Sequence, residues 1–546
     1  MEIEIGRTRI GDVVDANAAS LAENIALAYY EYGFRMSFSD FHEQCDRVAK
    51  GLMALGIKRG DHFAFWSHNL PEWVYTQFGS AKMGGVMVTV NTNFRAFELE
   101  YLLQQSDATT LIMTGGVREA EEYLRVINQV CPELKNSQPG QLNSKKFPFL
   151  KNVIYLGEER IPGMYTWQDM LEMGRNISDS ELRAREDSLD PEDVIMMQYT
   201  SGTTGYPKGV MLTHSNLLGN ACSMAEIMAL SPEDTLCIPV PFFHCFGCVI
   251  GTMCSVVSGT TMAPVTSFSA PKVLETVESL QCTALHGVPT MFIAELEEMG
   301  KKSYDTSHLR TGVMAGSTCP VEVMRGVIDT MGAGEMTIVY GQTESSPGIT
   351  QTRRHDSLQV RTETVGRALP HVEVTIADSN TGKELPPGET GELITRGYHV
   401  MKGYYKMPEK TREVIDDDGW LYTGDLAVMD EEGNFRIVGR LKDMIIRGGE
   451  NIYPREIEEF LYTHPKIKDA QVVGVPSQKY GEEVAAFIQL RDGIDAEEEE
   501  IRDFCREQIA YYKIPEYVCF VEEFPSTASG KIQKYRLRES FFSAES

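Results

Sequence analysis

Short apolar runs alternate with amphipathic stretches along the first part of this chain. Residues 38–55 carry a helical pattern and are followed by a continuous apolar run over 62–66. The same order repeats, with a helical pattern over 71–83 and an apolar run over 86–90. Helices that alternate with short strands are typical of α/β architecture. The pattern therefore predicts a layered α/β structure, and residues 271–280 continue it as another helix.

The pattern changes near Gly366. Short strands are predicted at 372–376, 391–395 and 435–438, and turn residues separate each strand from the next. A run of short strands without intervening helices indicates a small β-rich region between two α/β regions.

A compact α/β unit is predicted after Arg440. Pro454 is predicted to be the first residue of a helix, a position that proline favours. Asp495 and Glu498 have the form of a capping-box variant that opens a second helix. The apolar faces of these two helices are predicted to carry Ile457, Phe460 and Leu461, and Ile501, Phe504 and Cys505, respectively.

The length of the chain indicates more than one domain. A chain of 546 residues is too long for a single hydrophobic core. Since the pattern of predicted helices and strands changes after Arg440, we predict an N-terminal domain over residues 1–441 and a C-terminal domain over residues 442–546.

The charge balance narrows the range of partners. Lysine and arginine total 51 against 79 aspartate and glutamate residues, a formal net charge of −28. Such a surface repels nucleic acids and anionic membranes, so neither is expected as a partner. Residues 1–7 lack the apolar core of a targeting peptide, and no apolar run approaches the ~18 residues that span a bilayer. The protein is therefore predicted to have no transmembrane segment and to be cytoplasmic.

The chain has eleven cysteines, scattered without a repeating framework. This usage suits a reducing compartment. Cys245 and Cys248 have the spacing of a metal or redox pair, but no second pair accompanies them. Because they lie in the apolar stretch 242–257, we expect them to pack as small hydrophobic residues.

The segment 200–209 concentrates hydroxyl groups and glycines. It reads Thr-Ser-Gly-Thr-Thr-Gly-Tyr-Pro-Lys-Gly and lies between two predicted buried strands, 194–197 and 209–212. Glycines let the backbone approach a ligand closely, and Lys208 adds a positive charge for phosphate oxygens. The spacing differs from that of the common P-loop, and a flexible hairpin is the alternative. We predict a polyphosphate site whose residues are Thr200, Ser201, Gly202, Thr203, Thr204, Gly205 and Lys208.

This loop is similar to the phosphate-binding signature of the adenylate-forming enzymes, a family that includes acyl-CoA synthetases, adenylation domains of peptide synthetases and luciferases. Four more segments resemble motifs of that family in the expected order: Tyr340-Gly341-Gln342-Thr343-Glu344, Gly419-Trp420-Leu421-Tyr422-Thr423-Gly424-Asp425, Gly439-Arg440-Leu441-Lys442-Asp443 and Pro525-Ser526-Thr527-Ala528-Ser529-Gly530-Lys531. The resemblance covers nearly the whole chain. It implies a large N-terminal domain of layered α/β subdomains with a small β-subdomain, and a small mobile C-terminal α+β domain.

The resemblance implies a two-step reaction. A carboxylate attacks the α-phosphate of ATP, which gives an acyl-adenylate and pyrophosphate, and the thiol of CoA then displaces AMP. The first step needs charge neutralisation and in-line placement. Lys531 is expected to bridge the carboxylate and the α-phosphate, with Thr343 beside that phosphate; the motif spacing selects Lys531 over nearby Lys534. Glu344 and Thr204 are expected to hold Mg²⁺, which suits carboxylate, phosphate and water oxygens.

Further residues are expected to bind the nucleoside. Tyr340 with Gly341 offers a flat face for adenine, and Gly316 with Ser317 matches the opposite wall. Asp425 is expected to accept hydrogen bonds from the ribose hydroxyls, with an Asx-turn as the alternative. Arg440 is expected to reach the ribose or a phosphate.

Two other positions are expected to serve the second half-reaction. Lys442 matches the hinge at which the C-terminal domain rotates between the half-reactions, and an exposed linker lysine is the alternative. Gly448 and Gly449 match a loop that helps form the tunnel for CoA, and a plain strand-to-helix turn is the alternative.

The acyl pocket carries the least specific residues. Phe243 and His244 lie where the family gates its acyl site; His244 is expected to orient the carboxylate or close the pocket, and a packed histidine is the alternative. The remaining expected wall residues are small or apolar: Gly287, Val288, Met314 and Ala315. Such a pocket favours an uncharged tail, and the local sequence looks most like that of medium-chain fatty acyl-CoA synthetases.

The sequence thus predicts an ATP-dependent acyl-CoA synthetase of fatty acid metabolism, with Mg²⁺ and CoA. Two alternatives stay open. One is a freestanding adenylating enzyme that loads an aryl or fatty acid onto a carrier protein. The other is a nucleotide-binding sensor with the same fold, which the presence of Lys531, Glu344 and Asp425 disfavours.

Overall fold

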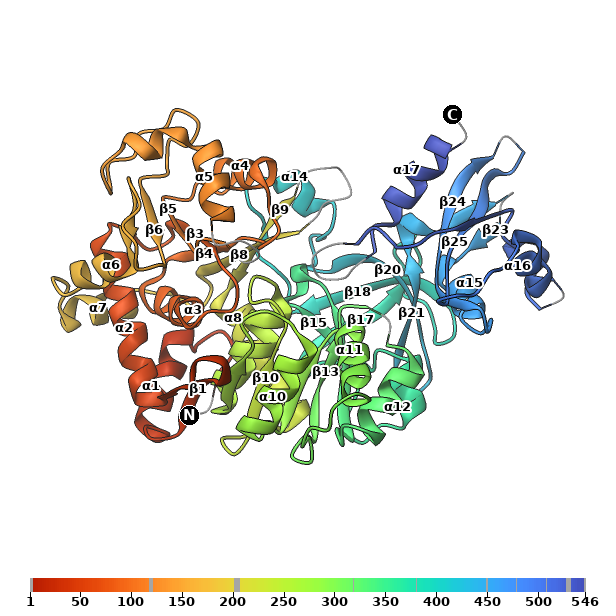
Figure 1. The fold of residues 1–546 in the computed structure, drawn as a ribbon, viewed down its shortest axis with the longest axis horizontal. Helices are drawn as coiled ribbons and strands as arrows, with labels where there is room; N and C mark the ends of the chain where they lie inside the picture. The colour runs from red at the N-terminus through yellow and green to blue at the C-terminus, as the bar shows by residue number, and fades with distance from the viewer. Residues whose placement is uncertain are drawn as a thin grey trace. The chain divides into compact units, whose positions relative to one another are not determined.

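The computed structural model describes residues 3–116, 121–200, 207–317, 319–379, 381–447, 450–477, 479–506, 508–526 and 532–544. The chain forms two compact units (Figure 1). The first comprises Met1–Glu373 and Arg396–Leu421, and the second Val374–Thr395 and Tyr422–Ser546. The predicted boundary between residues 441 and 442 falls within the second unit, in the connection between its two sheets, and it stays a prediction.

The first unit contains a nine-stranded sheet in the order β16-β15-β14-β13-β12-β10-β11-β1-β2. The strands from β14 through β1 run parallel, whereas β2, β15 and β16 pair antiparallel at the two edges. Their bounds are β1 Ile25–Tyr29, β2 Phe34–Ser37, β10 Thr235–Ile238, β11 Thr261–Pro264, β12 Ala284–Gly287, β13 Thr311–Ala315, β14 Glu335–Gly341, β15 Gly348–Gln351 and β16 Arg367–Ala368.

An eight-stranded sheet in the same unit has the order β19-β9-β8-β4-β3-β5-β6-β7. Its strands are β3 His62–Trp66, β4 Val86–Thr89, β5 Thr110–Met113, β6 Asn152–Tyr155, β7 Tyr165–Thr166, β8 Val194–Thr200, β9 Lys208–Thr213 and β19 Gly403–Tyr404. The strands predicted in this region are therefore confirmed. Strands β8 and β9 pair antiparallel, and β19 joins β9 antiparallel from a segment far along the chain.

Helices cover both sheets. They are α1 Ile10–Ser20, α2 Phe38–Ala54, α3 Pro71–Met83, α4 Ala96–Gln105, α5 Glu122–Val130, α6 Trp167–Gly174, α7 Asp179–Asp187, α8 His214–Met228, α9 Cys254–Ser258, α10 Ala270–Leu280, α11 Pro289–Met299, α12 Val321–Asp329, α13 Leu358–Glu363 and α14 Pro408–Arg412. The predicted helix at 38–55 begins where the Ser37 hydroxyl accepts a hydrogen bond from the Asp40 N–H at 3.1 Å, an N-cap contact.

The structure confirms the predicted helix at 271–280 as α10, and the apolar face of this helix packs in the core beside the nine-stranded sheet. Helices α10, α11 and α12 lie along this sheet (Figure 1). The predicted apolar face of α10 is buried there with residues of α11, α12 and the strands: Val273, Leu274, Val277, Phe292, Val323, Met324, Leu285, Met314 and Ile338. This packing holds the strand ends at fixed positions, because close-packed interiors resist displacement.

The second unit contains two sheets. One has the order β17-β18-β20-β21, with β17 Val372–Ala377, β18 Thr390–Gly397, β20 Leu421–Met429 and β21 Phe435–Arg440. The other contains β22 Ile445–Arg447, β23 Glu450–Ile452, β24 Ile467–Ser477, β25 Gly481–Leu490 and β26 Tyr517–Phe520, with helices α15 Pro454–Leu461, α16 Glu498–Cys505 and α17 Lys534–Ala544. These observations confirm the predicted α/β fold class with a β-rich region after residue 366.

One local prediction in the second unit is wrong. The predicted capping box from Asp495 does not form, because α16 begins at Glu498 with Glu497 as its N-cap residue and has no side-chain cap hydrogen bond. Three glutamates in the first turn of α16 favour the helix start instead, through their interaction with the positive end of the helix dipole.

Candidate active site

The carboxyl ends of three parallel strands bring the predicted acyl and adenine residues together. Gly287 of β12 pairs with Met314 of β13, and Ala315 of β13 pairs with Val339 of β14. The other predicted wall residues lie at the end of β14 or in the connections that follow β12 and β13: Val288, Gly316, Ser317, Tyr340 and Gly341. Ligands in parallel α/β sheets bind at this edge, so the placement agrees with the predicted site.

Two glycines at this edge are required by the backbone. Gly316 has a φ of +91°, a conformation that residues with a Cβ rarely adopt, and a Cβ there would lie 3.1 Å from Val288 Cγ1. A Cβ on Gly341 would lie 1.8 Å from the Pro347 carbonyl oxygen. The predicted adenine walls therefore depend on glycine for close approach of the chain.

Glu344 is the meeting point of the predicted phosphate and metal residues. It lies in a short 3-10 turn, η4 (Thr343–Ser345), and is 9 % exposed. The Thr200 hydroxyl, at the end of β8, donates to Glu344 Oε1 at 3.4 Å. The Tyr404 hydroxyl donates to the same oxygen at 2.8 Å, and Lys208 Nζ lies 4.0 Å from the centre of the Tyr404 ring.

Tyr404 was missed by the sequence analysis. It lies in β19, which returns to the first unit from a segment that carries no chemical motif, and only strand pairing places it beside β9. Its position directly after Gly403 gave no signal of this contact.

Lys208 is half-buried, and Glu344 is buried. Burial lowers the pKa of the Lys208 ammonium from its ordinary value, and the charge of Glu344 opposes that shift. A partly desolvated ammonium interacts more strongly with an anion than one in bulk water does. The arrangement therefore suits a cation that meets phosphate oxygens.

His244 precedes the buried Cys245 and is itself half-buried, with its Nε2 atom shielded from solvent. Its Nε2 atom makes no hydrogen bond with the described residues, and its ring centre lies 4.3 Å from that of Phe243. Burial lowers the pKa of His244 to about 4, so the imidazole is neutral at pH 7.

The two cysteines of this segment pack as predicted. Cys245 is 5 % exposed and Cys248 is fully buried. The Cys245 thiol donates to Gln198 Oε1 at 3.0 Å, and Gln198 Nε2 donates to the Cys248 sulfur at 3.0 Å. Burial raises the pKa of the Cys245 thiol well above its ordinary value, which keeps it protonated and unreactive.

The predicted ribose residues lie in the second unit. Asp425 of β20 and Arg440 of β21 are register partners, and Arg440 Nε lies 3.2 Å from Asp425 Oδ1. The backbone before Asp425 is fixed by Gly424, whose φ is +72° and whose N–H donates to Glu392 Oε1 at 2.8 Å. Asp425 lies within β20, which continues to Met429.

The predicted hinge follows this sheet directly. Lys442 lies in η5 (Leu441–Asp443), a three-residue 3-10 turn between β21 and β22. The predicted residues Ser201, Gly202, Thr203, Thr204, Gly205, Gly448, Gly449 and Lys531 lie outside the described residues.

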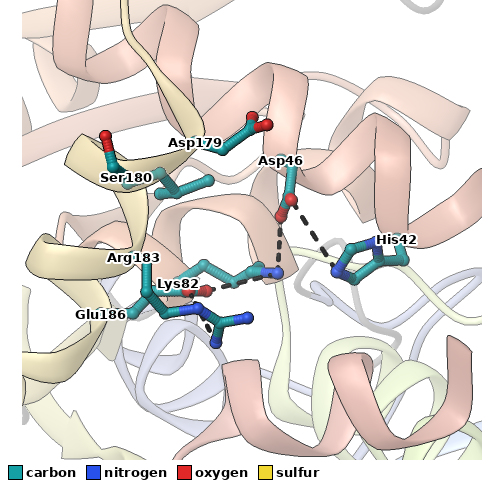
Figure 2. A pocket seen from close by; sticks show the side chains of 8 residues that line it. His42, Asp46, Lys82, Asp179, Ser180, Arg183 and Glu186 are labelled. Carbon is teal, nitrogen blue, oxygen red and sulfur yellow. Dashed lines mark ion pairs between the residues drawn. The ribbon is translucent and has the colours of Figure 1, made fainter. Parts of the chain in front are cut away.

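A cavity of about 270 Å³ lies away from these residues, on the N-terminal helices (Figure 2). Lys82 of α3 is 1 % exposed, and its Nζ lies 2.6 Å from Asp15, 2.5 Å from Asp46 and 3.3 Å from Glu186. Arg183, at the rim of the cavity, also pairs with Asp15 and Glu186. The ion pairs join α1, α2, α3 and α7, and none of the predicted site residues lines this cavity.

Comparisons with known proteins decide the family. The model of the AMP-binding enzymes matches residues 14–405, and the model of the AMP-binding enzyme C-terminal domain matches residues 456–531. This chain belongs to the AMP-binding enzyme family. It is 55 % identical to YngI of Bacillus subtilis, named as a putative acyl-CoA synthetase, over 98 % of this chain and 97 % of that relative.

Another relative and two solved structures are similar to this chain over nearly its whole length. The mitochondrial medium-chain acyl-CoA ligase ACSF2 of Rattus norvegicus is 40 % identical over 97 % of this chain and 87 % of its own length. The crystal structure of ATP-bound MatB from Rhodopseudomonas palustris is 27 % identical, covers 98 % of this chain and 99 % of its own, and has a TM-score of 0.83. The anthranilate CoA ligase AuaEII in complex with anthranoyl-AMP is 26 % identical, covers 100 % of both chains and has a TM-score of 0.84.

These matches confirm the predicted family and enzyme class, an AMP-forming acyl-CoA synthetase that uses ATP. Within the described residues, no helix is long and apolar enough to cross a membrane. The predicted cytoplasmic location, the use of Mg²⁺ and CoA, and the roles of individual residues stay predictions.

Proposed function

We propose that this enzyme activates a medium-chain fatty acid as an acyl-adenylate, with ATP and Mg²⁺, and transfers the acyl group to CoA. The observation that carries the proposal is the convergence of Thr200, Lys208 and Glu344, which brings a hydroxyl, a cation and a carboxylate together at the end of the predicted phosphate loop. The names of the rat relative and of YngI support the acyl-CoA part of the proposal.

In the first step, a carboxylate oxygen of the acid attacks the α-phosphorus of ATP, and the bond to the leaving pyrophosphate breaks. Lys208 would stabilise charge on the phosphates, and Lys531 would stabilise the attacking carboxylate beside the α-phosphate. Glu344 would hold Mg²⁺, and its donor set fits: Oε1 already accepts from Tyr404, and no described side chain donates to Oε2. The ion would neutralise charge on the phosphate oxygens.

In the second step, the CoA sulfur attacks the acyl carbonyl carbon, the mixed-anhydride bond to phosphate breaks, and AMP leaves while the thiol proton is released to solvent. Asp425 and Arg440 would hold the nucleotide by its ribose. Lys442 would be the hinge between the two steps, and Gly448 and Gly449 would line the path of CoA.

The acid is proposed from the acyl pocket. Its expected wall residues are small or apolar, which favours an uncharged tail. The neutral imidazole of His244 has a buried Nε2 without a partner among the described residues, so it can donate one hydrogen bond to the carboxylate of the acid. A carboxylic acid with a free ammonium group would find no expected carboxylate partner there.

The test is pyrophosphate release with ATP, Mg²⁺ and a panel of acids from butyrate to palmitate, with benzoate and several amino acids, each with and without CoA. Turnover that depends on CoA and peaks at medium chain lengths is expected. Pyrophosphate release that CoA does not accelerate would instead indicate a carrier protein as acceptor. Nucleotide binding with no release for any acid would indicate a sensor.

A further inference from the structure

The Tyr404 side chain contacts both Lys208 and Glu344, the cation and the carboxylate of the proposed phosphate site. We propose that Tyr404 is a positioning residue for adenylation, which orients the Glu344 carboxylate with its hydroxyl and seats the Lys208 ammonium on its ring. The proposal rests on the function proposed above, because it assigns Tyr404 a part in that reaction.

The hydroxyl fixes one end of Glu344. It donates to Oε1 at 2.8 Å, a better distance than the 3.4 Å from the Thr200 hydroxyl to the same oxygen. The phenol is the donor of this bond, because an ionised carboxylate can only accept. With Oε1 engaged, the carboxylate cannot rotate freely, and Oε2 is left for a cation.

The ring fixes Lys208. The ammonium lies 4.0 Å from the centre of the Tyr404 ring, within the range of a cation–π interaction. No described carboxylate forms an ion pair with Lys208, so the charge is held in place without being neutralised. A cation held in this way keeps its attraction for phosphate oxygens, which an ion pair with Glu344 would weaken.

Tyr404 is itself rigidly held. It pairs with Val210 of β9, which lies two residues beyond Lys208. The side chains of Tyr404 and Lys208 therefore lie on the same face of the sheet as diagonal neighbours. Its N–H donates to the Thr411 hydroxyl at 2.9 Å, and the residue is 4 % exposed. Lys208 and Glu344 are therefore set relative to each other before a nucleotide binds.

The experiment tests the contributions of the Tyr404 hydroxyl and the Tyr404 ring separately. Tyr404→Phe keeps the ring and removes the hydroxyl, and Tyr404→Leu removes both. Tyr405→Phe is the matched control, because the Tyr405 hydroxyl donates to Asp107 at 2.9 Å, in the adjacent position and to a different carboxylate. The readouts are Mn²⁺ affinity with a non-cleavable α,β-methylene ATP analogue, measured by electron paramagnetic resonance, affinity for the analogue without metal, melting temperature, and the two half-reactions assayed separately.

Tyr404→Phe is expected to weaken Mn²⁺ binding about tenfold or more, to lower the rate of pyrophosphate release, and to leave metal-free nucleotide affinity and thioester formation from supplied acyl-adenylate unchanged. Tyr404→Leu should also weaken metal-free nucleotide binding, and Tyr405→Phe should change neither. Mn²⁺ affinity within about twofold of wild type for Tyr404→Phe would overturn the proposal, and so would equal loss in both half-reactions with a lower melting temperature.

The same measurements keep the two proposals apart. If the wild-type protein binds Mn²⁺ with the analogue but releases no pyrophosphate with any acid, the proposed function fails. The binding comparison between Tyr404→Phe and Tyr405→Phe still decides whether Tyr404 orients the carboxylate.

Discussion

Lys534 and Glu458 form an ion pair within the second unit, with Lys534 Nζ 2.5 Å from Glu458 Oε1. Lys534 also donates to the Val472 carbonyl at 3.2 Å, and the Val472 N–H donates to the same Glu458 oxygen at 2.7 Å. The Lys534 ammonium therefore joins α17 to α15 and β24. Of the two lysines near the C-terminal motif, Lys534 therefore has a structural role, and the catalytic role of Lys531 stays a prediction.

Lys531→Ala should slow acid-dependent pyrophosphate release by about 10²–10³-fold, because one preorganised donor to the reacting groups is lost. Thioester formation from supplied acyl-adenylate should change far less, since the bond that Lys531 assists is already made. Single-turnover assays of each half-reaction measure both effects, and equal loss in the two would contradict the role.

Lys534→Ala is the control for this lysine pair. It leaves the buried Glu458 carboxylate with fewer donors, so we expect the free energy of unfolding to fall by about 1–3 kcal/mol. Any loss of activity should affect both half-reactions in parallel, in contrast to Lys531→Ala. Thermal melting and the same two assays distinguish these outcomes.

The role of Asp425 can be tested on the substrate as well as on the protein. If its carboxylate accepts from the ribose hydroxyls, replacing ATP with 3′-deoxy-ATP should lower kcat/KM of the wild type about tenfold or more, the value of a hydrogen bond to a charged group. Asp425→Ala should show little further loss with the deoxynucleotide. If 3′-deoxy-ATP lowers kcat/KM of Asp425→Ala as much as it lowers that of the wild type, Asp425 does not contact that hydroxyl.

Lys82 should matter for stability and not for chemistry. Lys82→Met would leave three carboxylates around a buried position without their cation, so we expect a loss of about 3–5 kcal/mol. Arg183→Gln is the matched control, since its side chain is 64 % exposed and pairs with two of the same carboxylates; it should cost under about 1 kcal/mol. The shift of the first urea-unfolding transition of the full chain measures both, and equal shifts would contradict the burial argument.

The same cluster predicts an acid-sensitive stability. Burial alone would raise the pKa of the Asp15 carboxyl, but hydrogen bonds from His42 and Lys82 hold that pKa well below its ordinary value. Because the folded pKa lies below the unfolded value of about 4, Asp15 contributes stability that is fully present above about pH 4 and is lost as the pH falls through the folded pKa. Burial raises the pKa of Glu186, which gives that group the opposite sign.

Asp15→Asn should therefore lose less stability than the wild type between about pH 4 and pH 2. Urea unfolding at about pH 7, 4 and 3 provides the comparison. Parallel losses in the two proteins would show that Asp15 does not carry this dependence.

The sequence predicted those features that depend on neighbours along the chain. The strands around the phosphate loop, the helix at 38–55 and the apolar face of the helix at 271–280 all follow from local pattern, and the structure confirms them. The sequence did not predict that Gly287 and Ala315 lie at the ends of neighbouring parallel strands, because the order of strands in a sheet depends on distant segments.

The contacts made between distant segments could not be predicted. Tyr404 reaches Glu344 because β19 returns to β9, and strand pairing between remote segments leaves no periodic signal in either one. Lys82 lies in a helix that is buried on all sides from Trp73 to Met83, so no polar face marked its burial. The helix at Glu498 starts without the predicted cap because its acidic first turn suffices.

The most direct test of the proposed chemistry follows an oxygen atom. The enzyme is supplied with octanoate labelled with ¹⁸O in both carboxylate oxygens, ATP, Mg²⁺ and CoA, and the products are analysed by mass spectrometry. Attack of the carboxylate on the α-phosphorus predicts one ¹⁸O in AMP, one in the thioester and none in pyrophosphate. Label in inorganic phosphate or pyrophosphate, or unlabelled AMP, would contradict an acyl-adenylate intermediate and with it the proposed function.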